Sequence, residues 1–237
     1  MPEIMMREFD LYYWPVPFRG QFLRAILAFA GARWTEHDAD EIAALMEQDA
    51  SDQPVAFMGP PVLVDRERDV ALSQMPAIAM YLGERLNLLP PSAEDRARTA
   101  KIANDANDVI DELTLDGGRE MWTQERWNAF VPRLQKWMHI FEDMGARRGL
   151  TAAKGFLLGT PTPGVADIIT SILWTTMADH LPKTAALCEE AAPALWGLAG
   201  RMQETPQLAT LRQKSAADFG DTYCGGEIEH SLHKVAG

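Results

Sequence analysis

Two adjacent prolines, Pro90 and Pro91, separate two parts of the chain that have different hydrophobic patterns. Proline cannot continue a helix, because it lacks a backbone N–H and its ring clashes with the preceding turn. The pair therefore ends one helix and prevents the next from starting early. Strand-like and helical segments alternate before the prolines, whereas only helical periodicity follows them. The sequence thus predicts an α/β domain at residues 1–88, a linker at 89–94 and an all-helical domain at 95–237.

The first part begins with an aromatic strand that leads directly into a turn and a helix. Phe9 to Trp14 is rich in the aromatic residues that favour strands, and Pro15-Val16-Pro17 ends this run. From Gln21 to Ala30 the apolar residues recur at helical spacing, and Gly31 follows as a C-terminal stop. The other elements expected here are a short helix at 42–46, a hairpin of 62–65 with 70–72, and a helix that starts near Met75. The order is βαβ followed by ββα.

The second part has no convincing strand alternation. Its apolar residues recur at helical spacing in four segments, which are 96–113, 125–144, 165–180 and 193–201. Gly164-Val165-Ala166-Asp167 has the spacing of a capping box in which glycine replaces the usual Ser or Thr. We therefore expect Asp167 to have a structural role at the start of its helix.

Charge and composition exclude several classes of function. The chain has 22 Lys and Arg against 34 Asp and Glu, and its net charge of -12 repels nucleic acids and anionic membranes. No apolar stretch approaches the roughly 18 residues of a membrane-spanning helix, and residues 1–8 lack the pattern of a secretory signal. Cys188 and Cys224 are too few for a disulfide framework, and His230 and His233 near the end lack the partners of a metal site. We expect a soluble, cytoplasmic protein with no metal, nucleic acid or membrane partner.

Four motifs in a fixed order together resemble one enzyme family. Leu11-Tyr12-Tyr13-Trp14-Pro15-Val16 looks like the first strand of tyrosine-type glutathione S-transferases, and Pro60-Pro61-Val62-Leu63 resembles their cis-proline loop. The run from Leu72 to Leu82 resembles the glutathione-anchoring helix, and Gly159 to Asp167 resembles the helix-start motif of the all-helical domain. The resemblance implies a cytosolic, bacterial-like member with a thioredoxin-like N-terminal domain followed by a helical-bundle C-terminal domain.

The chemistry of such a family points to Tyr13. A free thiol has a pKa of about 8.5, so only a few per cent is the nucleophilic thiolate at neutral pH. A tyrosine hydroxyl that donates a hydrogen bond to the sulfur stabilises the thiolate. Tyr12 and Tyr13 face opposite sides of a strand, and the family's Tyr-aromatic-Pro pattern selects Tyr13. No Ser or Cys precedes Ser51, so serine-type and cysteine-type chemistry lacks its key atom. A tyrosine packed in the core is the alternative for Tyr13.

The start of the helix at Ser73, Gln74 and Met75 is the site expected for the γ-glutamyl end of glutathione. Backbone N–H groups and the positive end of a helix dipole suit a carboxylate. The family usually has a Gln-Ser pair where this chain has Gln74 and Met75. Ser73 supplies the hydroxyl only if the loop is shifted by one position, and a simple helix cap explains Ser73 or Gln74 equally well.

Pro60 and Pro61 are expected to hold the peptide backbone of glutathione. A cis bond before Pro61 turns the chain so that the preceding residue meets a ligand as an added strand would. Pro60 offers its carbonyl but has no N–H, so half of a two-way backbone clamp is missing. No Lys or Arg occurs between Arg33 and Arg66, and the family's basic anchor for the glycine carboxylate is not evident.

Arg19 and Asp108 complete the candidate site. Arg19 matches a family position at the mouth of the active site, where a cation favours a thiolate, although a surface helix residue is the alternative. The resemblance implies that an acidic residue such as Asp108 meets the glutathione amine across a dimer interface, and a solvated helix face explains it equally well. Residues from the regions that form the family's electrophile pocket, which are otherwise core residues, are Met121, Trp122, Phe219 and Tyr223.

The leading hypothesis is a homodimeric glutathione transferase that conjugates or transfers the thiolate of glutathione to a small apolar electrophile. Glutathione is then the co-substrate, and the electrophile is the second partner. The rival hypothesis is a non-catalytic binding or interaction protein with the same fold. In that protein Met75, Pro60 and the missing basic anchor would leave glutathione binding weak or altered.

Overall fold

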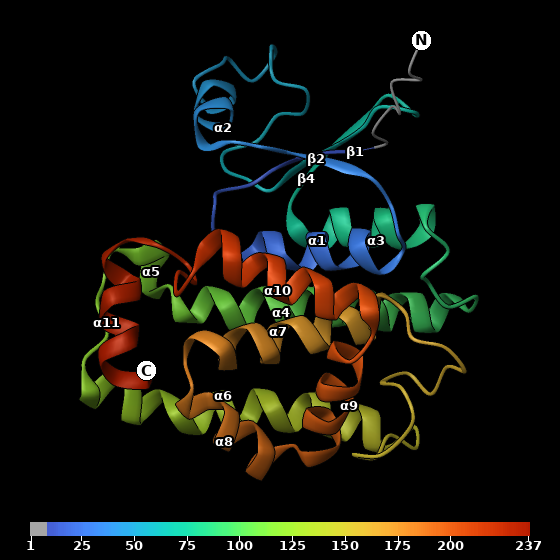
Figure 1. The fold of residues 1–237 in the computed structure, drawn as a ribbon, viewed down its shortest axis with the longest axis vertical. Helices are drawn as coiled ribbons and strands as arrows, with labels where there is room; N and C mark the ends of the chain where they lie inside the picture. Colours follow the sequence, from blue (N-terminus) through green and yellow to red (C-terminus); the bar gives the residue numbers. More distant parts are fainter. Residues whose placement is uncertain (1–8) are drawn as a thin grey trace.

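The computed structural model describes residues 9–237 and shows a small sheet-containing layer above a layer of helices (Figure 1). The N-terminal elements follow the order βαβαββα. They are β1 (Phe9–Tyr12), α1 (Phe18–Phe29), β2 (Trp34–His37), α2 (Ala39–Met46), β3 (Val62–Asp65), β4 (Val70–Ser73) and α3 (Met75–Arg85). The strand order in the sheet is β2-β1-β3-β4. β1 runs parallel to β2 and antiparallel to β3, and β3 runs antiparallel to β4, which confirms the predicted thioredoxin-like class.

The first strand lies inside the sheet, with its core side chains directed at helices. Phe9 and Leu11 are two residues apart and therefore point to the same face of the sheet. Neither side chain has exposed surface. Helices α1 and α3 lie between the sheet and the helical layer in Figure 1. Both surfaces of α1 are therefore covered, and nine of its twelve residues are buried.

The remaining elements are all helical, as the sequence predicts. They are α4 (Ala93–Leu113), α5 (Leu115–Gly118), α6 (Gln124–Ala146), α7 (Val165–His180), α8 (Lys183–Ala191), α9 (Pro193–Gln203), α10 (Pro206–Phe219) and α11 (Gly226–Ala236). The four segments predicted as helices correspond to α4, α6, α7 and α9. Helical periodicity did not predict α5, α8, α10 or α11. In α8 and α10 only two residues each are buried, so they carry little apolar periodicity.

The proline pair lies in the connection between the two layers. α3 ends at Arg85 and α4 begins at Ala93, where the Ser92 hydroxyl caps the helix by accepting a hydrogen bond from the Asp95 N–H at 3.1 Å. α1 contacts α7 and α10 as well as α3, so the two layers share a continuous packed interface. The division of function between residues 1–88 and 95–237 stays a prediction.

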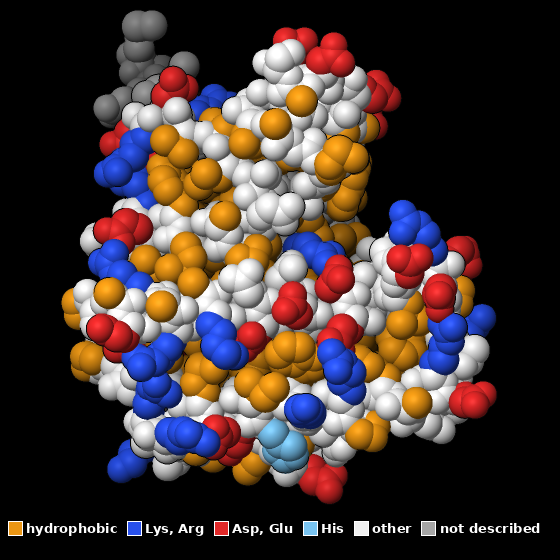
Figure 2. All heavy atoms as spheres, turned by 180° about the vertical axis from the view of Figure 1, so that it is seen from behind, with side chains coloured by type: hydrophobic (Ala, Val, Ile, Leu, Met, Phe, Trp, Pro, Cys, Tyr) orange, Lys and Arg blue, Asp and Glu red, His pale blue; other side chains and the backbone are white. Residues whose placement is uncertain are grey.

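The face of the molecule drawn in Figure 2 carries side chains of mixed type. On the face drawn in Figure 2, basic and acidic side chains are interspersed over the helical part, and the surface is hollowed where the upper lobe meets it. Within residues 9–237, no helix is both long and apolar enough to cross a membrane. Cys188 and Cys224 are free thiols.

Asp167 fixes the start of α7 from a fully buried position. Its carboxylate accepts hydrogen bonds from the Gly164 N–H at 2.9 Å and from the Leu157 N–H at 2.7 Å. Burial raises the pKa of Asp167 to about 6, while these backbone bonds favour the ionised form that accepts them. Glycine is required at the cap because a Cβ on Gly164 would lie 2.6 Å from the Leu88 carbonyl oxygen. The expected structural role of Asp167 agrees with this geometry.

Gly164→Ala is therefore expected to lower the free energy of unfolding by about 1–3 kcal/mol, because the added methyl group overpacks the joint between α7 and Leu88. Chemical denaturation measures the change. Gly200→Ala is the matched control, since apart from the neighbouring backbone of α9 nothing lies within 4 Å of its Cβ position, and it should stabilise by about 0.5–1 kcal/mol. Equal effects of the two substitutions would contradict the steric explanation.

Candidate functional site

Tyr13 follows β1 directly and lines a cleft of about 620 Å³ between the two layers. The turn after β1 and Pro60 form one side of this cleft, which we call the tyrosine cleft. The end of α4, α5 and the segment before α11 form the other side. Tyr13 is only 4% exposed, so its ring is packed while the residue still borders the cleft. The position of Tyr13 thus has features of a core aromatic and of a cleft residue, and its role in activating a thiol stays a prediction.

The hydroxyl of Tyr13 is held by the first turn of α1. Its oxygen accepts a hydrogen bond from the Arg19 backbone N–H at 3.1 Å, so its own hydrogen remains to be donated. Burial raises the pKa of Tyr13 above its ordinary value, and the charge and backbone N–H of Arg19 offset this only in part. The phenol is therefore protonated at neutral pH and can act as a hydrogen-bond donor.

Gly20 and Arg24 fix the ring of Tyr13 against α1. A Cβ on Gly20 would lie 2.7 Å from Cγ of the ring, so only glycine lets the ring approach the helix this closely. The Arg24 guanidinium lies 5.7 Å from the ring centroid, within the range of a cation–π contact. α1 therefore positions both the oxygen and the face of this tyrosine.

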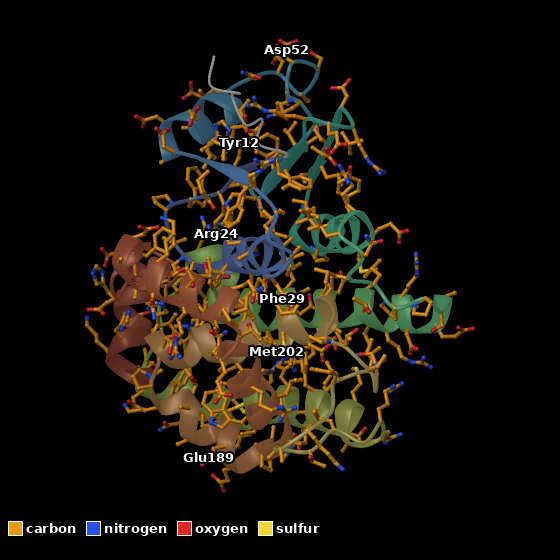
Figure 3. The ribbon with its side chains drawn as sticks, turned by 45° about the vertical axis from the view of Figure 1, so that its right-hand side comes forward. Tyr12, Arg24, Phe29, Asp52, Glu189 and Met202 are labelled. Atoms are coloured by element: carbon orange, nitrogen blue, oxygen red, sulfur yellow. The ribbon has the colours of Figure 1, made fainter. Side chains whose placement is uncertain are left out.

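Tyr12 faces the opposite side, as strand alternation predicts. Its ring stacks on His37 of β2 at 3.9 Å between centroids, and His37 in turn contacts Asp10 and Glu41. Figure 3 places Tyr12 within the sheet layer, above the helix that carries Arg24. Tyr12 does not line the tyrosine cleft.

Arg19 borders the tyrosine cleft, but its guanidinium is paired with α4. Its Nε donates to Asn107 at 3.1 Å, and a terminal nitrogen forms an ion pair with Asp111 at 2.8 Å. Arg19 is the one Lys or Arg among the described residues that line this cleft. The side chain thus contributes positive charge near Tyr13 and also joins the two layers.

A second groove of about 400 Å³ lies at the start of α3, and we call it the α3 groove. Gln74 lines it together with Pro76, Ala77 and Met80 of α3 and with Asn104 and Asn107 of α4. Gln74 has a positive φ of 75°, which turns the chain sharply from β4 into the helix. Asn107 lines this groove and also bonds to Arg19, so the α3 groove and the tyrosine cleft meet along α4.

The other predicted glutathione contacts lie at different depths. Met75 is 1% exposed, so only its backbone can serve a ligand. Ser73 ends β4, where it pairs with Val62, and it is half-buried. The bond between Pro60 and Pro61 is cis, as the resemblance implies, and Pro60 lines the tyrosine cleft.

Asp108 lies on the exposed face of α4 and lines neither the α3 groove nor the tyrosine cleft. Burial raises its pKa above the ordinary value, and the neighbouring Asp105, Asp111 and Glu112 add to the shift. The resemblance implies that Asp108 contacts glutathione bound to a second subunit, and a single chain does not test this contact. Among the described residues, no group of three or more His, Cys, Asp or Glu could hold a metal ion.

The residues suggested for an electrophile pocket lie elsewhere. Trp122 and Tyr223 are buried in the core, because the Trp122 indole donates to the Leu113 carbonyl and the Tyr223 ring packs edge-on against Phe18. Met121 is 38% exposed, and Phe219 borders a different groove. The apolar residues of the tyrosine cleft that sequence reasoning missed include Val16, Phe18 and Ile228. The helical periodicity of α11 could have indicated Ile228.

Gly20→Ala is expected to lower the free energy of unfolding by about 1–3 kcal/mol, because the new methyl group collides with the Tyr13 ring. A double-mutant cycle with Tyr13→Ala tests this directly. Once the ring is removed, Gly20→Ala should cost far less, since the two residues are coupled only through their contact. Additive free energies, measured by chemical denaturation of the three variants, would contradict the packing of Tyr13 on α1.

Comparison with known proteins agrees with this architecture. The family described as "Glutathione S-transferase, C-terminal domain" matches residues 98–235. A Pi-class glutathione S-transferase of Onchocerca volvulus superposes with a TM-score of 0.70 at 18% identity, covering 89% of this chain and 94% of that one. A glutathione S-transferase of C. elegans gives a TM-score of 0.69 at 22% identity, with 88% and 97% covered.

A third solved structure is that of Na-GST-3 from the hookworm Necator americanus, which is described as monomeric. It superposes with a TM-score of 0.69 at 18% identity, covering 87% of this chain and 97% of that one. At these identities the superpositions establish a common fold alone, and they support neither the bacterial-like nor the tyrosine-type subgroup that the sequence predicts. No curated protein matches the chain by sequence. The match to the C-terminal domain spans more than half of the sequence, and the chain belongs to the glutathione S-transferase family.

Proposed function

We propose that this protein is a tyrosine-type glutathione transferase that adds the thiolate of glutathione to a small apolar electrophile or exchanges it for a leaving group. The observation that carries the proposal is the protonated Tyr13 hydroxyl, held by the Arg19 N–H at the edge of a cleft. A donor in this position favours the charged form of a bound thiol. The reaction needs little else from the protein, because the thiolate is itself the nucleophile.

Tyr13 would act as a fixed donor and not as a base. Its raised pKa keeps the hydrogen on the phenol at neutral pH, so the proton lost by the thiol leaves to solvent. The oxygen cannot swing away easily, because the Arg19 N–H holds it and α1 packs against the ring. A donor that is already oriented stabilises developing negative charge without reorganisation during the reaction.

The α3 groove would receive the γ-glutamyl end of glutathione. Gln74 offers an amide, and the Met75 N–H lies at the start of α3, where the helix dipole favours an anion. Asn104 and Asn107 supply further polar groups on the facing wall. Pro60 would lend its carbonyl to the peptide backbone near Tyr13, and the electrophile would pack on Val16, Phe18 and Ile228.

The assembly and location belong to the same proposal. We expect a homodimer in the cytoplasm, with Asp108 on the exposed face of α4 directed at the glutathione of the partner subunit. This expectation rests on the family. Gel filtration with light scattering measures the dimer directly.

Glutathione should stabilise the folded protein if it binds. At a hundred times its dissociation constant, a ligand that binds only the native state adds about 2.7 kcal/mol to the free energy of unfolding. We expect millimolar glutathione to raise the melting temperature by several degrees. Ophthalmic acid, which replaces the thiol with a methyl group, is the matched control ligand and should give a similar shift. No shift with either compound would favour the non-catalytic rival, in which Pro60 and the buried Met75 side chain leave glutathione too weakly held.

Tyr13→Phe should reduce turnover of 1-chloro-2,4-dinitrobenzene by about 10- to 100-fold while the glutathione affinity changes little. The reason is the loss of one hydrogen bond to a charged sulfur, which is worth about 1.5–3 kcal/mol. The pH dependence of turnover should move to higher pH, because the bound thiol then ionises less readily. Tyr12→Phe is the control, since Tyr12 stacks on His37 away from the cleft. Unchanged turnover in Tyr13→Phe would remove Tyr13 from the mechanism.

A further inference from the structure

The segment from Gly220 to Gly226 forms part of the wall of the tyrosine cleft and is held in an unusual way. Three consecutive backbone N–H groups in it, those of Tyr223, Cys224 and Gly225, donate to one oxygen of Glu229 at 2.8, 2.7 and 2.6 Å. We call residues 220–226 the cover segment. A single carboxylate oxygen thus organises the backbone beside Tyr13.

Glu229 lies on a helix that is itself anchored to the rest of the molecule. The Ser231 hydroxyl of α11 accepts a hydrogen bond from the Trp122 backbone N–H at 3.0 Å, and Lys183 donates to the Val235 carbonyl at 3.1 Å. Ile228, Leu232 and Val235 bury the apolar side of the helix. Glu229 therefore ties the cover segment to a fixed support.

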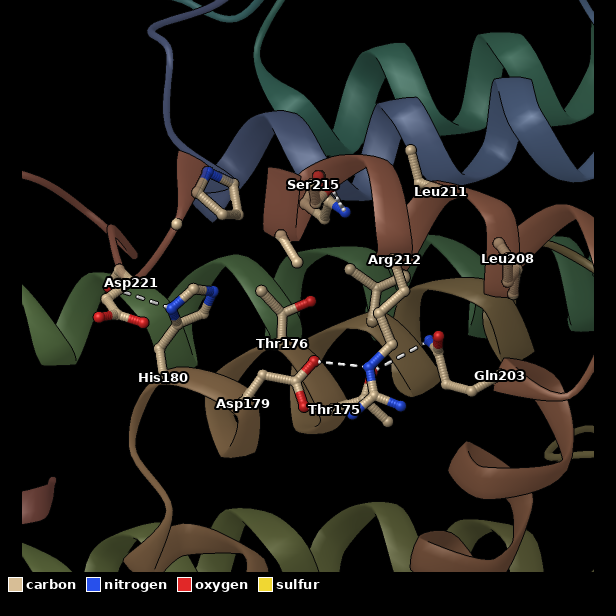
Figure 4. A pocket seen from close by; sticks show the side chains of 15 residues that line it. Thr175, Thr176, Asp179, His180, Gln203, Leu208, Leu211, Arg212, Ser215 and Asp221 are labelled. Carbon is tan, nitrogen blue, oxygen red and sulfur yellow. Dashed lines mark hydrogen bonds and ion pairs between the residues drawn. The ribbon is translucent and has the colours of Figure 1, made fainter. Parts of the chain in front are cut away.

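The cover segment lines the tyrosine cleft with Cys224, Gly225 and Gly226, and Tyr223 packs in the core behind them. The ring of Tyr223 packs edge-on against Phe18 at 5.3 Å and stacks on His180 at 5.4 Å, so it fills the space behind the cleft. Cys224 follows and lines the cleft directly. Figure 4 shows the other side of this segment, where His180 lies beside Asp221 and a ring nitrogen meets the Asp221 carbonyl at 3.2 Å.

At its start the cover segment is held by hydrogen bonds from the Gly220 and Thr222 N–H groups to α10 and by His180 at Asp221, whereas at residues 223–225 the backbone N–H groups bond to Glu229. Gly220, Gly225 and Gly226 all have positive φ, so the chain turns at both ends of the segment in conformations that glycine adopts most readily. Charge-assisted hydrogen bonds are about twice as strong as neutral ones, and Glu229 makes three of them. Loss of the carboxylate would remove the three bonds at residues 223–225 and the ion pair of Glu229 with His233 at 3.8 Å, while the buried apolar side chains of α11 keep their packing.

We propose that Glu229 is a positioning residue that latches the cover segment against the tyrosine cleft and so shapes the wall that an electrophile meets. The proposal rests on the proposed transferase function for its catalytic consequence, whereas the latch itself is a property of the fold. Glu229 contacts neither glutathione nor the electrophile in this scheme. It acts through the backbone of Tyr223, Cys224 and Gly225.

The thiol of Cys224 reports on the latch without any assay of activity. Dithiobis(nitrobenzoate) reacts by exchange: the Cys224 thiolate attacks its disulfide, a mixed disulfide forms, and one thionitrobenzoate leaves. Burial raises the pKa of Cys224 to about 12, and the charge of Glu229 adds to the shift, so removal of that charge alone accelerates labelling. Glu229→Gln and Glu229→Ala both remove the charge, but only Gln retains an oxygen that accepts the three N–H groups. The difference between them isolates the latch.

We expect Glu229→Ala to label at Cys224 about tenfold faster than Glu229→Gln, with the site of labelling assigned by peptide mass mapping. Cys188 is 1% exposed in the core and serves as the internal control, because its labelling follows only global unfolding. Glu189→Ala, on the exposed surface of α8 at the bottom of Figure 3, makes the same charge change far from the cleft and should leave the Cys224 rate unchanged. Equal Cys224 rates in the Ala and Gln variants, or parallel acceleration of Cys188, would overturn the latch.

Steady-state kinetics test the positioning role. Glu229→Ala should raise the KM for 1-chloro-2,4-dinitrobenzene several-fold while the KM for glutathione stays unchanged, and Glu229→Gln should restore much of the difference. Faster labelling of Cys224 with an unchanged electrophile KM would refute the positioning role. Absence of any turnover in the wild-type protein would refute the proposed transferase function instead, and the labelling rates would still decide whether Glu229 latches the segment.

Discussion

The arrangement around Tyr13 depends on one buried guanidinium. Arg24 is 4% exposed and forms two bonds with the carboxylate of Glu36, at 2.9 and 3.1 Å, while another nitrogen donates to the Val16 carbonyl at 2.9 Å. Its charge lies over the rings of Tyr13 and Phe219, at 5.7 and 5.0 Å from their centroids. A buried cation is tolerated only when its donors are satisfied, so the side chain fixes every group that it contacts. Arg24 therefore fixes the position of α1 relative to three other segments, which are β2, the turn after β1 and the end of α10.

This arrangement explains why the first strand and helix could be recognised from sequence. Tyr13, Pro15 and Pro17 lie within a few residues of one another, and their roles follow from local rules of strand alternation and proline geometry. The helix at Met75 and the capping carboxylate of Asp167 are also local features. The sequence therefore predicts those elements whose conformation depends on residues close to one another in the chain.

The far wall of the cleft was not predictable, because long-range pairs make it. Asn107 and Asp111 contact Arg19 from 88 and 92 residues away, and no local pattern distinguishes them from the other polar residues of a solvated helix face. The same holds for Tyr223, which sequence reasoning suggested for the electrophile pocket but which the packing of Phe18 and His180 draws into the core. The apolar residues of an amphipathic helix predict which face is buried, but they do not predict which side chains that face contacts.

The charges that line the candidate site favour hydrogen bonds over ion pairs for the glutathione of the proposed function. Glutathione carries two carboxylates, yet the described lining of the tyrosine cleft and α3 groove offers one Lys or Arg, and Asp111 pairs with that Arg19. Backbone N–H groups at the start of α3 and amides from Gln74 and Asn107 are the remaining partners for an anion. Neutral hydrogen-bond donors attract an anionic ligand less strongly than cations do. Once oriented, they can still stabilise the negative charge of a thiolate, and they bind other anions only weakly. In the proposed enzyme, stabilisation of the thiolate would therefore depend more on the placement of Tyr13 by α1 than on positive charge at the surface of the cleft.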